Sequence, residues 1–280
     1  KRTRIGDNVL KALIYLAAGV AIALLVGIMG YVFVRGLPQV SWQFLSTVQS
    51  SLKGTFGILG NIINTIYIIV ITLIIAAPIG IGSAIYLNEY AKPGKLVRTI
   101  EFTTEILSGI PSIIFGLFGM VFFGMTLKLG YSVLTGSFTL TLMVLPLITR
   151  NTQEALKTVP DSYRSGALGI GATKWYMIRT ILLPSAAPGI LTGVILSIGR
   201  IVGESAALLF TAGSGFQLPK NLFGKLFESS GTLTIQLYLS MQKAKYDQAF
   251  GIAVVLLIIV LGINLLTRFL TNRFDVTKLK

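Results

Sequence analysis

The sequence predicts an all-α integral membrane protein, and three observations support this class. Hydrophobic residues make up 53% of the chain and charged residues only 12%, whereas ordinary soluble domains carry about 25% charged residues. The mean hydropathy is +0.79. The apolar residues are gathered into runs of about 20, which is the length that crosses a bilayer as a helix.

Six apolar runs are long enough to be transmembrane helices. The first run is uncharged, longer than a signal-peptide core and without a small-residue cleavage site, so we do not expect it to be a cleaved signal peptide. A tight polar turn separates the third and fourth runs. We expect all six to form one transmembrane domain over residues 1–280. The expected spans are residues 12–34, 62–87, 106–127, 129–149, 181–211 and 248–267.

The distribution of basic residues predicts the orientation of these spans. With six spans, both termini lie on the same side of the membrane. Of the 24 lysine and arginine residues, sixteen fall on that side, seven fall on the other, and Arg200 lies within a span. Short cytoplasmic loops are enriched in Lys and Arg, so we expect cytoplasmic termini. Topology thereby accounts for the net charge of +14 without a nucleic-acid partner.

The sequence lacks the residues that several kinds of catalytic and metal-binding chemistry require. The chain has no cysteine and no histidine, which excludes disulfides, thiol nucleophiles, and thiolate or imidazole metal sites. No serine–lysine or paired-aspartate arrangement stands out inside the spans, and no GxxxxGK[ST] phosphate-binding loop is present. The sequence therefore predicts no catalytic residue, metal or cofactor, and we do not expect an enzyme.

The longest connection on the cytoplasmic side covers residues 150–179. Residues 159–162 (VPDS) form a helix-start signal, and Gly169 and Gly171 indicate a stop or a tight turn. We expect a short helix from about residue 162 to 168 along the membrane surface, followed by a turn and a return helix. The alternative is a solvated connector that only links two spans.

Two charged residues interrupt the fifth span. Arg200 and Glu204 are four residues apart, so on a helix they share one face. A charge inside the membrane costs roughly 2.5–3.5 kcal/mol on insertion scales. One interpretation is an ion pair that fixes helix packing. The other, which we favour, is a station on an anion pathway, because the planar guanidinium suits phosphate oxygens; the ion pair would then be its resting state.

The third span contains a break signal. Pro111 lacks an amide hydrogen, and Ser112 is able to cap a new helix start, so the segment Gly109–Ser112 should break or kink this span. Two interpretations follow. The one that we favour for this break is a simple packing kink, and the other is a half-helix whose N-terminus within the membrane attracts an anion. Glu101 and Glu105 lie at the cytoplasmic entrance of this span, where we expect them to be solvated.

The outer loop, residues 214–247, is long enough to carry a function. Two interpretations stay open. In one, the loop docks an extracytoplasmic partner and its lysines attract anions toward the pore. In the other, it is a solvated or pore-capping loop. The lysines concerned are Lys220, Lys225, Lys243 and Lys245.

Three stretches carry a resemblance to a known family. Residues 165–184 (SGALGIGATKWYMIRTILLP) resemble the cytoplasmic loop of ATP-binding-cassette (ABC) importer permeases, whose pattern is EAA, three residues, Gly, nine residues and Ile-x-Leu-Pro. Ala167, Gly171 and the final Ile-x-Leu-Pro are in register, whereas Ser165 and Gly166 replace the glutamate and an alanine. Residues 109–119 (GIPSIIFGLFG) and 203–213 (GESAALLFTAG) are similar to the PstA family of phosphate-importer permeases.

This resemblance, which covers about residue 60 to the C-terminus, implies a type I importer permease fold in a bacterial or archaeal cell (inner) membrane. It implies inward transport of inorganic phosphate, with ATP hydrolysed on a separate subunit. The implied partners are a PstC-like second permease, a PstB-like ATPase dimer and a PstS-like extracytoplasmic phosphate-binding protein. Alternatives are a permease for another oxyanion such as molybdate or sulfate, or, from another class, an intramembrane enzyme or an assembly factor.

The resemblance also assigns roles to residues. It implies a part in phosphate translocation for Arg200 and Glu204, and we place Ser112 on the same pathway. The ATPase-coupling residues that it implies are Ser165, Gly166, Ala167, Gly171, Lys174 and Trp175.

Overall fold

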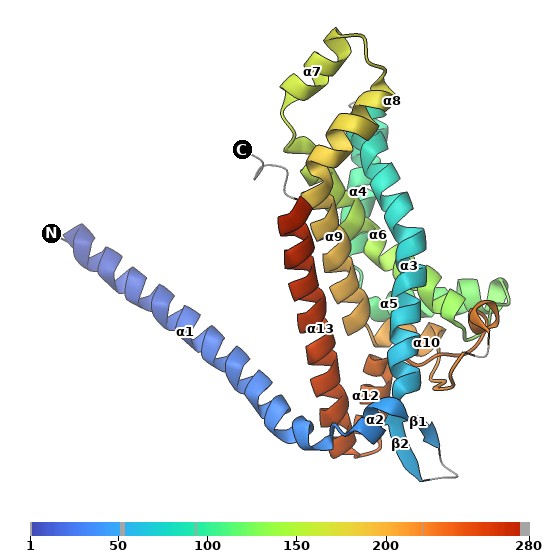
Figure 1. Ribbon diagram of the computed structural model, residues 1–280. Helices are drawn as coiled ribbons and strands as arrows, with labels where there is room; N and C mark the ends of the chain where they lie inside the picture. The colour runs from blue at the N-terminus through green and yellow to red at the C-terminus, as the bar shows by residue number, and fades with distance from the viewer. Residues whose placement is uncertain (1, 51–53, 93, 220, 275–280) are drawn as a thin grey trace.

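The computed structural model describes residues 2–50, 54–92, 94–219 and 221–274, most of which are helical (Figure 1). Four long helices pack into a bundle: α3 (Leu59–Ile85), α6 (Val133–Lys157), α9 (Leu183–Gly203) and α13 (Tyr246–Phe274). α1 (Arg2–Gly36) diverges from this bundle. A hairpin of two short antiparallel strands, β1 (Val48–Ser50) and β2 (Thr55–Ile58), lies at the end of the bundle opposite α7 (Asp161–Gly169).

The remaining elements are short helices and helical turns that connect the long ones. They are η1 (Leu37–Gln39), α2 (Trp42–Ser46), η2 (Tyr86–Tyr90), α4 (Lys95–Gly109), α5 (Ser112–Gly119), η3 (Met120–Thr126), α8 (Lys174–Met177), η4 (Ile178–Leu182), α10 (Ala206–Thr211), α11 (Leu222–Lys225) and α12 (Leu233–Gln242).

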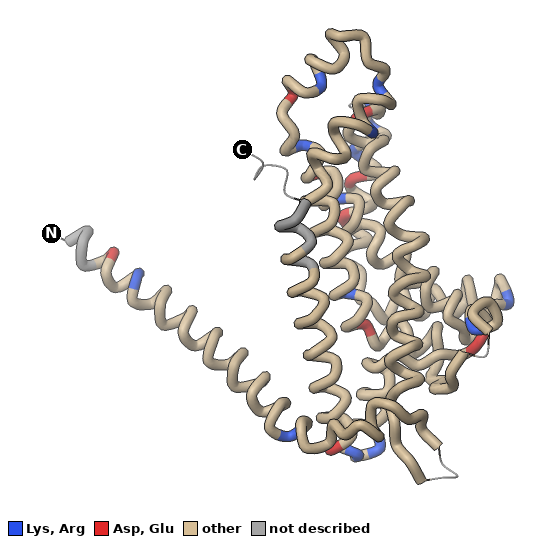
Figure 2. Tube along the Cα trace, in the orientation of Figure 1, with Lys and Arg blue, Asp and Glu red and all other residues tan. Residues whose placement is uncertain are grey.

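The described part of the chain holds five helical stretches that are long and apolar enough to cross a membrane, or six if one bent pair counts as a span. Charged residues gather toward the two ends of the bundle, with few between them (Figure 2). The five stretches are Gly6–Gln39, Leu59–Tyr90, Val133–Lys157, Lys174–Gly203 and Tyr246–Leu266, and the bent pair is Lys95–Gly109 with Ser112–Thr126.

The third expected span, residues 106–127, is not one continuous helix. α4 and the segment that follows it meet at 101°. Ile110 and Pro111 are extended, with ψ of 130° and 139°, because the proline ring disfavours helical backbone in the residue before it. The expected break is therefore confirmed. The expected cap is wrong, because Ser112 is the first residue of α5 and its side chain accepts no capping hydrogen bond.

Two other expected boundaries also shift. α6 continues to Lys157 and α8 begins at Lys174, so the expected connection 150–179 starts and ends inside helices. The segment outside the long helices is residues 158–173, with α7 in its middle. The expected span 181–211 is interrupted at Glu204 and Ser205, because α9 ends at Gly203 and α10 begins at Ala206.

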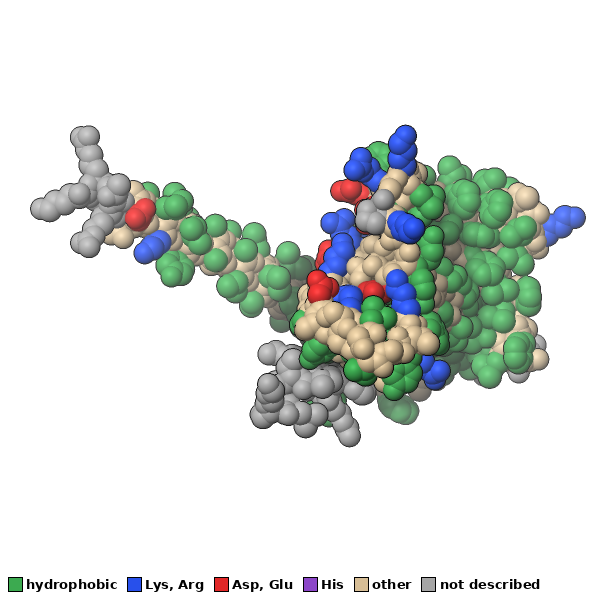
Figure 3. Space-filling model, turned by 90° about the horizontal axis from the view of Figure 1, so that it is seen from above, with side chains coloured by type: hydrophobic (Ala, Val, Ile, Leu, Met, Phe, Trp, Pro, Cys, Tyr) green, Lys and Arg blue, Asp and Glu red, His purple; other side chains and the backbone are tan. Residues whose placement is uncertain are grey.

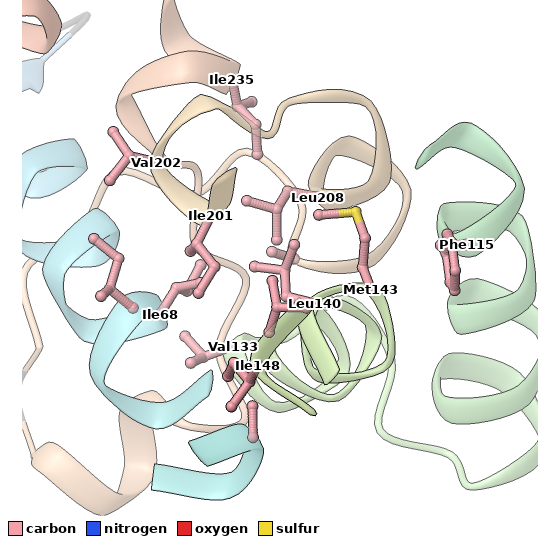
Figure 4. Packing of buried hydrophobic residues seen from close by; sticks show 14 residues of the cluster. Ile68, Phe115, Val133, Leu140, Met143, Ile148, Ile201, Val202, Leu208 and Ile235 are labelled. Atoms are coloured by element: carbon pink, nitrogen blue, oxygen red, sulfur yellow. The ribbon is translucent and has the colours of Figure 1, made fainter. Parts of the chain in front are cut away.

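The main core lies where α3, α6, α9, α10 and α12 meet (Figure 4). Ile68, Leu140, Ile148 and Leu208 are fully buried in it. Lipid tails are as apolar as these side chains, so inside the membrane close packing, more than the hydrophobic effect, holds such helices together. Gly80 on α3 illustrates the fit, because an added Cβ would lie 2.7 Å from the side chain of Ile148 on α6.

α1 contributes little to this core. In the most apolar 18-residue stretch of α1, no residue is buried. The helix meets the bundle only near its C-terminal end. There Tyr31 packs edge-on against Phe250 of α13 with ring centroids 5.6 Å apart. Gly36 sits so close to the same residue that a Cβ would overlap the Phe250 carbonyl oxygen. The rest of the helix presents its apolar surface outward.

The segment between α10 and α13 is folded back across the ends of α3 and α6. The Asn61 side chain donates a hydrogen bond to the Gly231 carbonyl at 2.9 Å, and that of Asn64 donates to the Gly215 carbonyl at 3.0 Å. The Val133 amide at the start of α6 donates to the Glu228 carbonyl at 3.2 Å. This segment, residues 212–219 and 221–245, is therefore packed over the end of the bundle and is not a free loop. We call it the strap.

The strap changes the expectation for its lysines. The Lys225 residue is 1% exposed, and its ammonium donates to the Gln217 carbonyl at 2.8 Å. Lys225 therefore holds the strap together, and the interpretation in which the lysines attract anions does not apply to this residue. Lys243 and Lys245 are exposed, whereas Lys220 lies outside the described residues.

Candidate functional site

The break between α9 and α10 separates the two charged residues of the fifth apolar run. Arg200 is in the last turn of α9, whereas Glu204 follows the helix with φ −79° and ψ 126°. Because Glu204 has left the helix, the two side chains do not share a helical face. The described residues include no ion pair between them, so the expected resting pair is not formed in this structure.

Glu204 is bound to the elements around the break. Its Oε1 atom accepts a hydrogen bond from the Ala207 amide at 3.0 Å, which satisfies a free N–H in the first turn of α10. Its own carbonyl accepts a hydrogen bond from the Thr234 hydroxyl of α12 at 2.8 Å. The residue is half-buried. Glu204 thus fixes the start of α10 and ties the break to α12.

Arg200 is exposed on the surface of the isolated chain. Among the described residues, no hydrogen bond or ion pair is formed by its guanidinium group. A guanidinium carries five N–H donors and a permanent positive charge. At an interrupted transmembrane helix, such a group is able to bind an oxyanion or an acidic group from outside the chain.

Ser112 is the first residue of α5, a helix that packs against α10. Gly116, one turn into α5, approaches α10 so closely that a Cβ would lie 2.8 Å from the Ala207 Cα atom. Phe115 beside it is buried in the main core. Ser112 is half-buried at the α5 N-terminus, where the extended Pro111 leaves the first N–H groups of the helix uncapped by a side chain.

The segment between α6 and α8 forms the expected short helix and turn. α7 covers Asp161–Gly169, and the Ala172 amide donates to the Ala167 carbonyl at 3.0 Å. Gly171 has φ +85°, so this is a helix end that uses a left-handed glycine. The expectation of a short helix, a turn and a return helix is confirmed.

The six expected coupling residues fall into two groups. Ala167 is 5% exposed and packs against residues of α6 and α8, so it holds α7 onto the chain. Trp175 in α8 is 59% exposed, and Ile170 at the end of α7 is 87% exposed. The residues that face outward are Ser165, Gly166, Gly171, Lys174 and Trp175. Seen from this end of the bundle, Lys and Arg side chains gather on the face among acidic ones (Figure 3).

Arg164 is a functional candidate that sequence reasoning missed. Its Nη2 atom lies 3.0 Å from Glu89 Oε1 in η2, and Nη2 also donates to the Leu156 carbonyl at 2.9 Å. Its Nη1 atom donates to the Val159 carbonyl at 2.9 Å and to Asp161 Oδ1 at 3.0 Å. Arg164 and Glu89 are 75 residues apart in the chain, so no local pattern in the sequence indicates that they pair.

A second contact joins η2 to α8, on the other side of the turn after α7. The Lys174 ammonium, at the start of α8, lies 4.9 Å from the centroid of the Tyr90 ring in η2. Such a cation–π contact is favourable by about 0.5–1 kcal/mol at an exposed site. The surface segment is therefore tied to the end of α3 from both sides of its turn.

A cavity of about 280 Å³ opens at this end of the bundle between α4 and α6. It is lined by both acidic and basic side chains. Glu101 and Glu105 belong to its wall and are exposed, as expected. The described residues contain no group of three or more acidic side chains placed to hold a metal ion. The other charged residues of the wall are Arg150, Glu154 and Lys157.

Comparison with known proteins agrees with this architecture. Residues 76–277 match the family described as "Binding-protein-dependent transport system inner membrane component". The chain is 35% identical over 282 residues to the probable ABC transporter permease protein YqgI of Bacillus subtilis (strain 168), with 95% of each chain covered. It is 32% identical over 285 residues to the phosphate transport system permease protein PstA of Mycobacterium leprae (strain TN), covering 97% of this chain and 91% of the relative.

Among solved structures, a chain of the bacterial alginate ABC transporter in complex with an alginate pentasaccharide-bound periplasmic protein has the same fold. The TM-score is 0.71 at 16% identity, with 96% of each chain covered. The region that matches the family, residues 76–277, includes α6, α9 and the surface segment between them. The chain belongs to the family of binding-protein-dependent transport system inner membrane components, and it is a multi-pass permease subunit of an ABC importer.

Proposed function

We propose that this permease subunit carries inorganic phosphate into the cytoplasm. Arg200 carries the proposal, because its guanidinium lies at a break in a transmembrane helix, is exposed, and has no partner among the described residues. The similarity to a phosphate transport system permease over 97% of the chain supports phosphate as the anion.

The chemistry of Arg200 suits a passing phosphate. Guanidinium N–H groups bind phosphate oxygens with charge-assisted hydrogen bonds, often in pairs. In the proposed pathway, phosphate reaches Arg200 when the pore opens outward and leaves when it opens to the cytoplasm. Glu204 fixes the start of α10 beside this point, and the N-terminus of α5 at Ser112 adds a favourable helix dipole.

The proposal includes the partners that the transport cycle requires. A PstC-like permease completes the pore, a PstB-like ATPase dimer binds the surface segment around α7, and a PstS-like extracytoplasmic protein delivers phosphate. Both termini then lie in the cytoplasm, on the side of α7. The abundance of Lys and Arg on this face supports that orientation (Figure 3).

Uptake of labelled phosphate by the assembled importer tests the proposal. We expect uptake that depends on ATP and that excess molybdate or sulfate does not abolish. Arg200→Gln should assemble but lose uptake. Arg200→Lys keeps the positive charge, but its uptake should still be impaired because it lacks the planar guanidinium group that binds two phosphate oxygens at once. Arg98→Gln, which changes an exposed arginine of α4, is the matched control and should transport normally. Uptake by Arg200→Gln at the rate of the unmodified importer would contradict the proposed pathway.

The nearer alternative is a permease for another oxyanion, which would be shown by stronger uptake of molybdate or sulfate than of phosphate. An intramembrane enzyme or assembly factor is the farther one. It would be favoured if the chain bound no ATPase subunit and needed none for activity.

A further inference from the structure

The contacts of Arg164 bring three elements to one side chain. The guanidinium binds the Glu89 carboxylate in η2, two carbonyl oxygens at the end of α6, and the Asp161 carboxylate at the start of α7. The carbonyls of Leu156 and Val159 lie where α6 stops, and a cation there satisfies groups that have no partner within the helix. Arg164 therefore fixes how α7 leaves α6 and where it stands relative to η2.

Burial distinguishes the Arg164–Glu89 pair from an ordinary surface ion pair. The Glu89 side chain is 5% exposed and that of Arg164 is 19% exposed. In the Arg150–Glu154 pair at the same end of the bundle, each side chain is 64% exposed. Exposed pairs of this kind contribute little, whereas the loss of one partner from a buried pair leaves an uncompensated charge. The Arg164–Glu89 contact is thus the one that resists separation.

The element on the other side of the pair is continuous with α3. η2 follows α3 without a break, and together they form a helical stretch of 32 residues, Leu59–Tyr90. Asn61 and Asn64 at its opposite end bind the carbonyls of Gly231 and Gly215 in the strap. A displacement of η2 therefore acts on a continuous helix that reaches the other end of the bundle.

We propose that Arg164 and Glu89 are positioning residues that transmit movement of α7 to α3 during the transport cycle. The proposal rests on the proposed docking of the ATPase on the α7 segment. Lys174 over Tyr90 is the weaker second contact between the same segments, because both of its residues are exposed. Without the Arg164–Glu89 pair, α7 follows the ATPase while η2 does not follow α7.

A distance measurement tests the contact in the purified chain. Spin labels on cysteines at Tyr86 in η2 and Leu168 in α7 report the separation of the two elements, and the chain has no native cysteine to interfere. Both positions are about half exposed, at 49% and 52%. Glu89→Gln should broaden the distance distribution. Asp161→Asn removes a carboxylate that also binds Arg164 but is 97% exposed, and should leave the distribution unchanged. Equal distributions in Glu89→Gln and the unsubstituted labelled chain would overturn the proposal.

A functional measurement uses the complete importer in proteoliposomes. The readout is the amount of phosphate imported per ATP hydrolysed. We expect Glu89→Gln to lower this ratio about tenfold, which is within the usual range of coupling between sites, while ATP hydrolysis continues. Glu154→Gln makes the same chemical change in the exposed pair and should keep the ratio of the unmodified importer.

A double variant guards against loss of assembly. Arg164→Gln with Glu89→Gln leaves no unpaired buried charge, so the complex should form, and the ratio should stay low. The positioning role is wrong if the unmodified importer transports phosphate and the double variant imports as much phosphate per ATP hydrolysed as the unmodified importer does. If the unmodified importer neither binds an ATPase nor transports phosphate, the proposed function has failed instead.

Discussion

The Oε1 atom of Glu204 accepts a hydrogen bond from the Ala207 amide at 3.0 Å, so this carboxylate belongs to the start of α10 and not to Arg200. The consequence is that the two charged residues of the break have separable roles. Glu204 holds the backbone, and Arg200 presents its charge outside the chain.

Substitutions at Glu204 should depend on the hydrogen-bond acceptor more than on the charge. Glu204→Gln keeps an oxygen able to bind the Ala207 amide and should melt close to the unmodified protein. Glu204→Ala removes that acceptor and should lower the stability by about 1 kcal/mol, as the loss of a helix cap does. Thermal unfolding in detergent measures both. Equal destabilisation by the two variants would show that the negative charge itself is required, as in an ion pair with Arg200.

A side chain at Gly171 should destabilise the turn after α7. An added Cβ would have open space around it, so its cost comes from the backbone, at φ +85°. Left-handed backbone costs an L-residue about 1–2 kcal/mol. We expect Gly171→Ala to reduce hydrogen-exchange protection in α7 and to lower the amount of substrate imported per ATP.

Gly166 provides the control for this prediction. A Cβ there also meets open space, but the residue lies inside α7 without a positive φ. Alanine in a helix interior is more stable than glycine by roughly 0.5–1 kcal/mol. Gly166→Ala should therefore increase protection in the same segment. Loss of protection in both variants would point to the space around the turn and not to its backbone conformation.

Asn64 should be important for holding the strap. Its Nδ2 atom donates to the Gly215 carbonyl at 3.0 Å and to the Gly231 carbonyl at 3.3 Å, and the residue is fully buried. Asn64→Ala removes both hydrogen bonds, but the Gly231 carbonyl keeps the Asn61 side chain as a donor and the Gly215 carbonyl keeps the Gly231 amide. Each lost bond should therefore cost about 0.5–1.5 kcal/mol. Limited proteolysis of the strap should become faster. Asn264→Ala removes an exposed asparagine that binds the Val260 carbonyl of its own helix, and should leave the cleavage rate unchanged.

Cysteine crosslinking should map the face of the α7 segment that meets the ATPase. Ile170→Cys and Trp175→Cys place thiols at positions that are 87% and 59% exposed, and we expect both to crosslink to the ATPase subunit in the assembled importer. Ala167→Cys is the internal comparison, because the side chain at 167 is turned into the chain and should not react. An intact complex without crosslinks at positions 170 and 175 would contradict docking at this segment.

The elements that the sequence alone determined are those with local causes. Membrane thickness sets the length of an apolar run, so the number of hydrophobic runs is readable from composition along the chain. Pro111 lacks an N–H group and constrains the residue before it, which predicts the break between α4 and α5. Gly171 tolerates a positive φ, which predicts the turn after α7.

Only the tertiary structure decided the contacts that give these elements their roles. The i, i+4 spacing of Arg200 and Glu204 predicts a pair only if the helix continues, and α9 ends between them at Gly203. The buried lysine of the strap looks like any other lysine in the sequence. Arg164 and Glu89 meet across 75 residues because α7 folds back onto η2. Periodicity and turn preference act within a few residues, whereas these contacts depend on how separate helices pack, so no local pattern encodes them.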